Sequence, residues 1–101
     1  MTDREVSFET ANHSADAIQR AAYRLSDRLS CTVVTEATRF RCTLHISADD
    51  AREVDAVVAD FRNEVLDQTL RARMREETSE VRHLILALAF SNTGLVDAAD
   101  A

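Results

Sequence analysis

The amino-acid sequence predicts a single α+β domain, in which a three-stranded sheet is packed by three helices. Apolar and polar residues alternate over 5–10, 30–36 and 39–46, as in half-buried strands. Between and after these stretches, apolar residues recur every three or four positions, as on the buried face of a helix. The expected order is β-α-β-β-α-α. At 101 residues the chain is long enough for one domain with a modest core, which we place at 1–101.

Composition and charge exclude several classes of protein. The formal net charge is −6, whereas a general nucleic-acid binder needs a basic face. All twelve basic residues are arginines and alanine is abundant. This bias is typical of a GC-rich bacterial genome, with selection for arginine's forked contacts as the alternative. No apolar segment follows Met1, and the longest apolar run is about half of the roughly 20 residues that span a membrane. We therefore expect a cytoplasmic protein with no nucleic-acid or membrane partner.

The first strand is expected at the edge of the sheet, because the chain terminus and not a hairpin bounds it. Its alternation points Val6 and Phe8 toward the core and Glu5, Ser7 and Glu9 outward. An open edge presents unpaired backbone groups to which an extended peptide can add as a further strand. The alternative is that this edge is short and charged because such edges resist aggregation.

The second and third strands form a hairpin that turns near Ala37 and Thr38. Cys31 and Cys42 fall on its core face, where we expect buried thiols, with a metal or redox role as the alternative. Cys42 and His45 are three residues apart, so on a strand they point to opposite faces and do not chelate a metal together.

The helices are placed by their caps and by their apolar stripes. Asn12 or Ser14 is expected to cap the first helix, Ser47 the second, and Thr78 or Ser79 the third. The stripe of the first helix is Ile18, Ala22, Leu25 and Leu29, and that of the second is Val54, Val58, Phe61 and Val65, widened by Val57. We expect Asn92 and Gly94 to end the third helix, and residues 95–101 to form a frayed acidic tail.

Two further apolar features concern how the helices are covered. The segment 81–90, VRHLILALAF, is apolar on nearly every side, so we expect it to lie at the centre of the core. Leu66, Leu70 and Met74 form a stripe rotated away from the core stripe of the second helix. We therefore predict that a homodimer forms through this stripe; the alternative is that the third helix folds back over it.

Catalytic and cofactor signatures are missing from the sequence. The three histidines are scattered, and the single glycine does not make a phosphate-binding loop. We expect no catalytic residue, cofactor or metal. Asn63, Asp67 and Arg71 share one helix face, where the last two form a structural pair or belong to an interface. Arg82 either pairs with the glutamates at 76 and 77 or contacts a partner.

Two segments resemble a known family. They are AAYRLSDR, residues 21–28, and FRNEVLDQTLRARMREETSEVRHLILALAF, residues 61–90. The second segment is similar to the C-terminal pattern of HxsD, the small protein of the His-Xaa-Ser system. The matching residues are Asp67, Leu70, Arg71, Thr78, Arg82 and the apolar run that ends Ala89-Phe90. Gln68 and Ala72 stand where the family pattern has tyrosine and glutamate.

The resemblance implies a place in a bacterial peptide-modification cassette. Such cassettes pair radical S-adenosylmethionine enzymes with a precursor that carries His-Xaa-Ser repeats, and this component is the non-catalytic one. The hypothesis is therefore an accessory protein that binds the precursor or the enzymes; the alternative is a stand-alone homo-oligomeric or regulatory module. A small enzyme is the third hypothesis. The candidate binding residues are Glu5, Ser7, Glu9, Asn63, Asp67, Arg71 and Arg82.

Overall fold

The computed structural model describes residues 1–93, with side chains for residues 1–89. The expected cap at Gly94 and the expected tail at 95–101 lie outside the described residues. The elements in chain order are β1 (Thr2–Glu9), α1 (Ala15–Arg24), β2 (Leu29–Thr35), β3 (Arg39–Ile46) and α2 (Ala51–Thr93). The chain divides into two compact units, Met1–Arg71 and a second unit that begins at Ala72. The predicted α+β class with a three-stranded sheet is confirmed.

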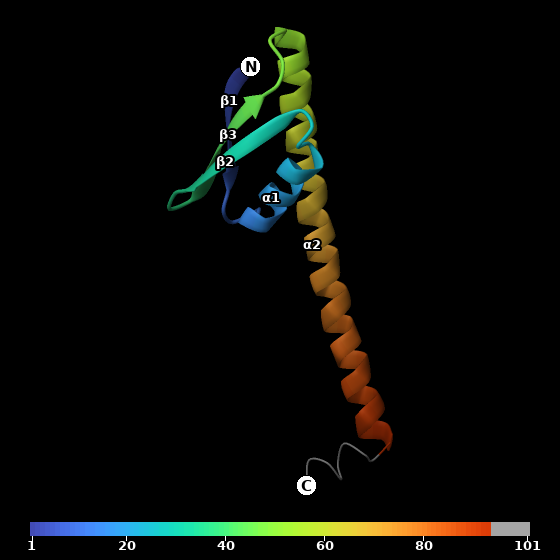
Figure 1. The fold of residues 1–101 in the computed structure, drawn as a ribbon. Helices are drawn as coiled ribbons and strands as arrows, with labels where there is room; N and C mark the ends of the chain where they lie inside the picture. Colours follow the sequence, from blue (N-terminus) through green and yellow to red (C-terminus); the bar gives the residue numbers. More distant parts are fainter. Residues whose placement is uncertain (94–101) are drawn as a thin grey trace. The chain divides into compact units, whose positions relative to one another are not determined.

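The sheet of the first unit has the strand order β1-β3-β2, so β3 lies in the middle and the other two strands form the edges (Figure 1). Both edge strands run antiparallel to β3, with Val6 and Val33 both opposite Cys42. The prediction that β1 is an edge strand is therefore confirmed. β1 begins at Thr2, three residues earlier than its alternation indicated.

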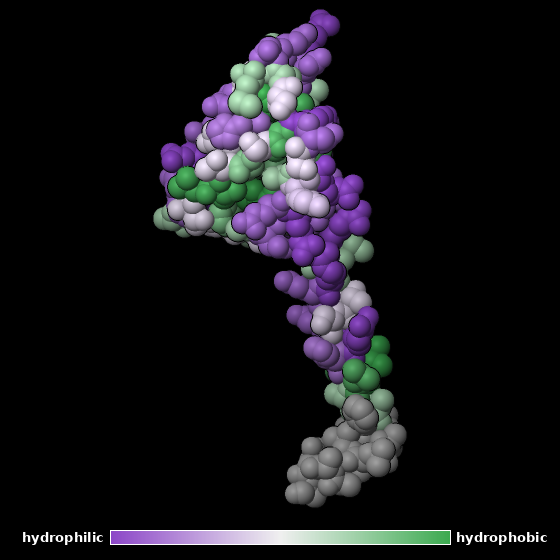
Figure 2. Space-filling model, viewed as in Figure 1, coloured by the Kyte–Doolittle hydropathy of each residue, from purple (hydrophilic) through white to green (hydrophobic). Residues whose placement is uncertain are grey.

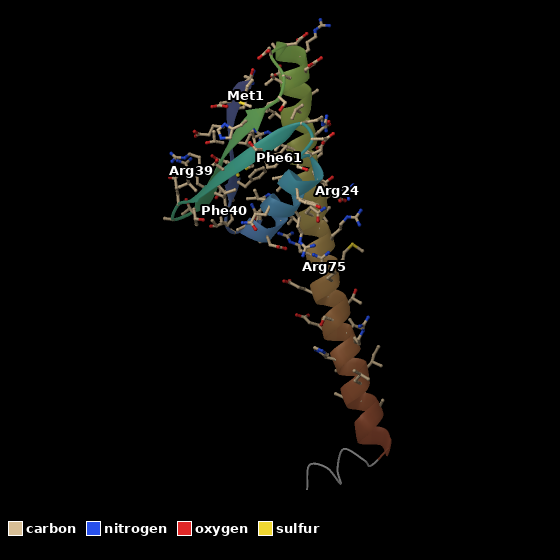
Figure 3. The ribbon with its side chains drawn as sticks, viewed as in Figure 1. Met1, Arg24, Arg39, Phe40, Phe61 and Arg75 are labelled. Atoms are coloured by element: carbon tan, nitrogen blue, oxygen red, sulfur yellow. The ribbon has the colours of Figure 1, made fainter. Side chains whose placement is uncertain are left out.

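One face of the sheet is apolar and the other is polar, as the alternation predicts. The buried core of the first unit comes from all three strands, α1 and the start of α2. α1 and the first part of α2 cover the apolar face, where Phe61 of α2 lies toward the sheet (Figures 1 and 3). The core residues are Val6, Phe8, Ile18, Ala21, Leu29, Phe40, Cys42, Leu44, Ile46, Val54, Val57, Phe61 and Val65.

Caps fix where α1 and α2 begin. Ser14 has an extended backbone, and its hydroxyl accepts a hydrogen bond from the N–H of Ala17 at 3.1 Å, so one of the two predicted caps is confirmed. The predicted cap at Ser47 is wrong, because α2 begins four residues later. Asp50 is the cap instead, since its carboxylate accepts from the N–H of Arg52 at 2.8 Å. Leu29, expected on the stripe of α1, is the first residue of β2, although it is buried as expected.

The break predicted between a second and a third helix is not present. α2 continues from Ala51 to Thr93, so Thr78 and Ser79 lie inside a helix and cap nothing. The sequence around them resembles a cap only because serine and threonine are followed by glutamate, and these residues are also tolerated on an exposed helix face.

The expected position of the apolar segment 81–90 at the centre of the core is wrong. The large apolar side chains of the described part of this segment are 47–60% exposed, and the core is built from residues 6–65 instead. The second unit, taken by itself, contains one helix among its described residues and no strand to surround it. No helix in the described range is apolar over a length that would cross a bilayer.

Candidate functional site

The outer face of β1 carries the predicted residues Glu5, Ser7 and Glu9, and all three are exposed. Asp3 extends this row, because β1 is longer than predicted. The row lies beside the outer residues of β3, and the cross-strand neighbours of Ser7 and Glu9 are arginines. The carboxylates of Asp3, Glu5 and Glu9 therefore make this face of β1 acidic, whereas the same face of the adjacent strand β3 carries arginines.

The backbone N–H groups of these outer residues point away from β3, at the open edge of the sheet. Thr10 N–H donates to Thr38 C=O at 3.0 Å, in the same register that places Phe8 opposite Phe40. Bonded and non-bonded pairs alternate along an antiparallel ladder, so Val6 and Phe8 bond to β3, and the N–H groups of Glu5 and Ser7 face outward. Within residues 1–93 these two N–H groups have no acceptor. The row thus offers backbone donors and carboxylates on one edge.

His45 lies on the same polar face, between two strands. Its Nδ1 is 2.9 Å from Asp3 Oδ1, and its Nε2 is 3.4 Å from Thr32 Oγ1. The neighbouring Cys42 points to the buried face, which confirms that this cysteine and this histidine do not converge. In the described part of the chain no three histidine, cysteine or acidic side chains gather as a metal site would require.

The two cysteines have free thiols on the core face, as predicted, although Cys31 is only half-buried. Their thiols interact across β2 and β3. The hydrogen bond to Cys31, followed by burial, raises the pKa of Cys42. The same hydrogen bond is the main cause that lowers the pKa of Cys31. The arrangement keeps Cys42 protonated and makes Cys31 the more acidic thiol.

The predicted helical candidates lie on α2. Asn63 and Arg71 are exposed and Asp67 is half-exposed, and Arg71 Nε is 2.7 Å from Asp67 Oδ2. The pairing of these two residues is therefore confirmed, and as an exposed i, i+4 pair it stabilises the helix by only about 0.3–0.5 kcal/mol. Arg82 belongs to the second unit, is exposed, and makes no ion pair among the described residues.

The predicted self-association stripe is exposed. Leu66, Leu70 and Met74 have exposed fractions of 51%, 49% and 66%. Apolar side chains at this exposure are available to a partner, and a homodimer through this stripe stays a prediction.

A buried polar contact between α2 and the turn that precedes α1 was not predicted. Thr69 is 6% exposed and its hydroxyl donates to Val65 C=O at 2.8 Å, so it accepts from His13 Nδ1, also at 2.8 Å. This fixes the proton of the imidazole on Nδ1. The His13 ring also meets the Phe8 ring edge-to-face at 5.3 Å. The sequence gives no signal of this burial, because Thr69 is polar and lies outside the apolar stripe that marks the buried face of the helix.

Beside this contact, Glu64 joins the two helices. Its carboxylate is 3.2 Å from Arg24 Nε of α1 and accepts from Gln68 Nε2 at 3.0 Å. An open hollow of about 470 Å³ lies here, lined by Asp16, Gln19, Arg20, Tyr23, Arg24 and Gln68. Tyr23 is 81% exposed at its rim. The hollow is polar and lacks a converging acid, base and nucleophile, so its residues do not form a catalytic constellation.

The fold and these surfaces define a small α+β protein with two open sheet edges and no recognisable catalytic constellation in its described residues. Residues 8–96 match the family model described as His-Xaa-Ser system protein HxsD. The chain belongs to this family. No curated protein and no solved structure gave a significant match.

Proposed function

We propose that this protein is a non-catalytic accessory component of a His-Xaa-Ser peptide-modification cassette. Its partner is the precursor peptide or the radical S-adenosylmethionine enzymes that modify the precursor. Family membership supports a role in the His-Xaa-Ser system. The observation that supports the binding role is the open edge of β1. This edge carries the unpaired backbone N–H groups of Glu5 and Ser7 and the exposed side chains of Glu5, Ser7 and Glu9.

An extended precursor segment binds this edge as a fourth strand. Its backbone C=O groups accept from the outward N–H groups of Glu5 and Ser7, which supplies affinity without depending on sequence. The carboxylates of Glu5 and Glu9 favour a peptide that carries histidine or basic residues. This attraction weakens with added salt, because the carboxylates are exposed.

The helical face of Asn63, Asp67 and Arg71 is the second candidate surface, and Arg82 is a further candidate contact for the enzymes. Charged and amide side chains on one helix face suit a docked protein more than an added strand. A pull-down with the enzymes separates this surface from the β1 edge, because variants of the helix face would then lose enzyme binding and keep peptide binding.

The test is isothermal titration calorimetry of the protein with a synthetic peptide that carries His-Xaa-Ser repeats. Ser7→Pro removes an outward donor and leaves the β1–β3 ladder intact, so we expect folded protein and lost binding. Asp67→Ala is the matched control and is expected to bind the peptide normally. If neither the peptide nor the enzymes bind the wild-type chain at micromolar concentration, the proposed role is wrong and a stand-alone oligomeric or regulatory module is favoured.

A further inference from the structure

The second edge of the sheet, β2, also presents unpaired backbone groups. Ser47 N–H donates to Arg28 C=O at 2.9 Å and Glu36 N–H donates to Arg39 C=O at 2.8 Å, one bond beyond each end of the β2–β3 ladder. Bonded pairs alternate between these ends, so Cys31, Val33 and Thr35 direct their N–H and C=O groups away from β3. Within the described chain, these three N–H groups meet no acceptor.

The side chains of the two edges differ in charge. β1 reads TDREVSFE and carries four charged residues in eight, whereas β2 reads LSCTVVT and carries none in seven. Charged residues on an edge strand are a usual protection against pairing with another chain. The acidic side chains of β1 protect it against pairing with a second copy of the same acidic strand, while still allowing a basic peptide. β2 lacks these charges, so a second copy of this chain can pair with it.

The core is also less well covered along β2. On the core face, Val6 of β1 is 2% exposed and Cys42 of β3 is 0% exposed, whereas Cys31 and Val33 of β2 are only half-buried. On the other face Val34 is 43% exposed. Figure 2 shows hydrophobic side chains at the surface alongside β2. A further strand would cover Cys31 and Val33 and so complete the core on this side.

We propose that the β2 edge pairs with the β2 edge of a second copy of this chain, giving a continuous six-stranded antiparallel sheet. Two copies of one strand meet across a two-fold axis, and each donates the same groups to the other. For a chain of net charge −6 the contact needs a neutral surface, which β2 supplies. The row of β1 does not pair with itself in this way, because the carboxylates of Asp3, Glu5 and Glu9 would be brought close to those of the second copy.

The experiment is light scattering of the whole chain over a range of concentrations. We expect twice the 11.3 kDa of one chain for the wild type and for Ser7→Pro. Val33→Pro removes one outward N–H of β2 and is expected to give 11.3 kDa. A wild type that stays monomeric at millimolar concentration overturns the proposal, and so does a Ser7→Pro variant that loses the dimer while remaining folded.

A second variant keeps the test decisive if the proline disturbs folding. Val34→Glu places like charges beside the two-fold axis on an exposed position, so it is expected to abolish the dimer and leave the fold intact. Leu70→Ser alters the competing helical stripe and is expected to stay dimeric. A dimer that survives Val34→Glu and is lost in Leu70→Ser overturns the β2 proposal. Because Ser7→Pro affects peptide binding and not the dimer, failure here is distinct from failure of the proposed function.

Amide hydrogen exchange gives an independent readout. In the dimer the amides of Cys31, Val33 and Thr35 are hydrogen-bonded, so their exchange slows as protein concentration rises. The outward amides of Glu5 and Ser7 are the internal control and exchange at a rate independent of concentration. Equal and concentration-independent exchange at both edges would contradict the pairing.

Discussion

Phe61 joins the two sides of the core of the first unit. It is fully buried, and its ring meets the Phe8 ring of β1 at 6.0 Å with the rings inclined at 61°. This edge-to-face contact is the favoured geometry for an aromatic pair. Phe61 therefore links α2 to an edge strand that has only β3 as its neighbour in the sheet, so we expect its loss to destabilise the sheet.

We predict that Phe61→Ala lowers the free energy of unfolding by about 3–5 kcal/mol, because it removes a large buried ring and leaves a cavity. Leu66→Ala is the control on the same helix. Leu66 is 51% exposed, so its loss is expected to cost less than about 1 kcal/mol. Urea denaturation followed by circular dichroism measures both values, and similar costs for the two variants would contradict this description of the core.

The two thiols are predicted to differ in reactivity. The hydrogen bond from Cys42 lowers the pKa of Cys31, so as the pH rises the thiolate forms first on Cys31. The pKa of Cys42 is raised and its side chain is fully buried. Iodoacetamide at about pH 8 is therefore expected to label Cys31 before Cys42, as peptide mass spectrometry would detect. In urea both are expected to label at similar rates; earlier labelling of Cys42 in the folded protein would be the contrary result.

At the scale of elements, the strands and their faces follow from local alternation, which a single sequence displays. The start of β1 was missed because Arg4 occupies a core-side position that usually holds an apolar residue. Its guanidinium instead reaches Asp55 of α2 at 3.1 Å, a contact between residues far apart in sequence. The burial of Thr69 was missed for the same reason, since its partner His13 comes from the turn between β1 and α1. The strands are thus predictable, but the site contacts between elements are not.

The continuity of α2 through Thr78 and Ser79 is open to a direct test. If Ser79 capped a helix, Ser79→Ala would reduce helicity, because a lost cap costs about 1 kcal/mol. Inside a helix the same change favours helicity by about 0.5 kcal/mol, because alanine is the best helix former. We expect the ellipticity at 222 nm to become more negative in Ser79→Ala, and Ser14→Ala, at a true cap, to show the opposite sign.

At the scale of the whole molecule, the buried core that residues 1–89 form lies between Val6 and Val65, inside the unit Met1–Arg71. The sequence alone did not predict this. Its most apolar segment, 81–90, indicated a central helix, since composition shows how apolar a helix is and not what covers it. The exposed apolar side chains there are a surface available for contact and contribute nothing to the core described here.

We therefore predict that a fragment ending at Arg71 unfolds in urea at the same midpoint as the complete chain. The fragment keeps all of the core residues, and the midpoint reports the stability that they provide. Measurements at low concentration avoid any contribution from self-association. A fragment that is unfolded or much less stable would show that residues after Arg71 supply stability that the core does not account for.

The central position of β3 sets an order of events as the chain leaves the ribosome. β1 and β2 are made first, yet neither has a neighbouring strand in the sheet until β3 emerges. The β2–β3 hairpin then closes a short loop, whereas β1 joins through Glu9 and Arg39, thirty residues apart. Longer loops close at greater entropic cost. We therefore expect β1 to be the last strand to join the sheet. Until then its acidic segment is unpaired in the nascent chain and is accessible to another binding partner.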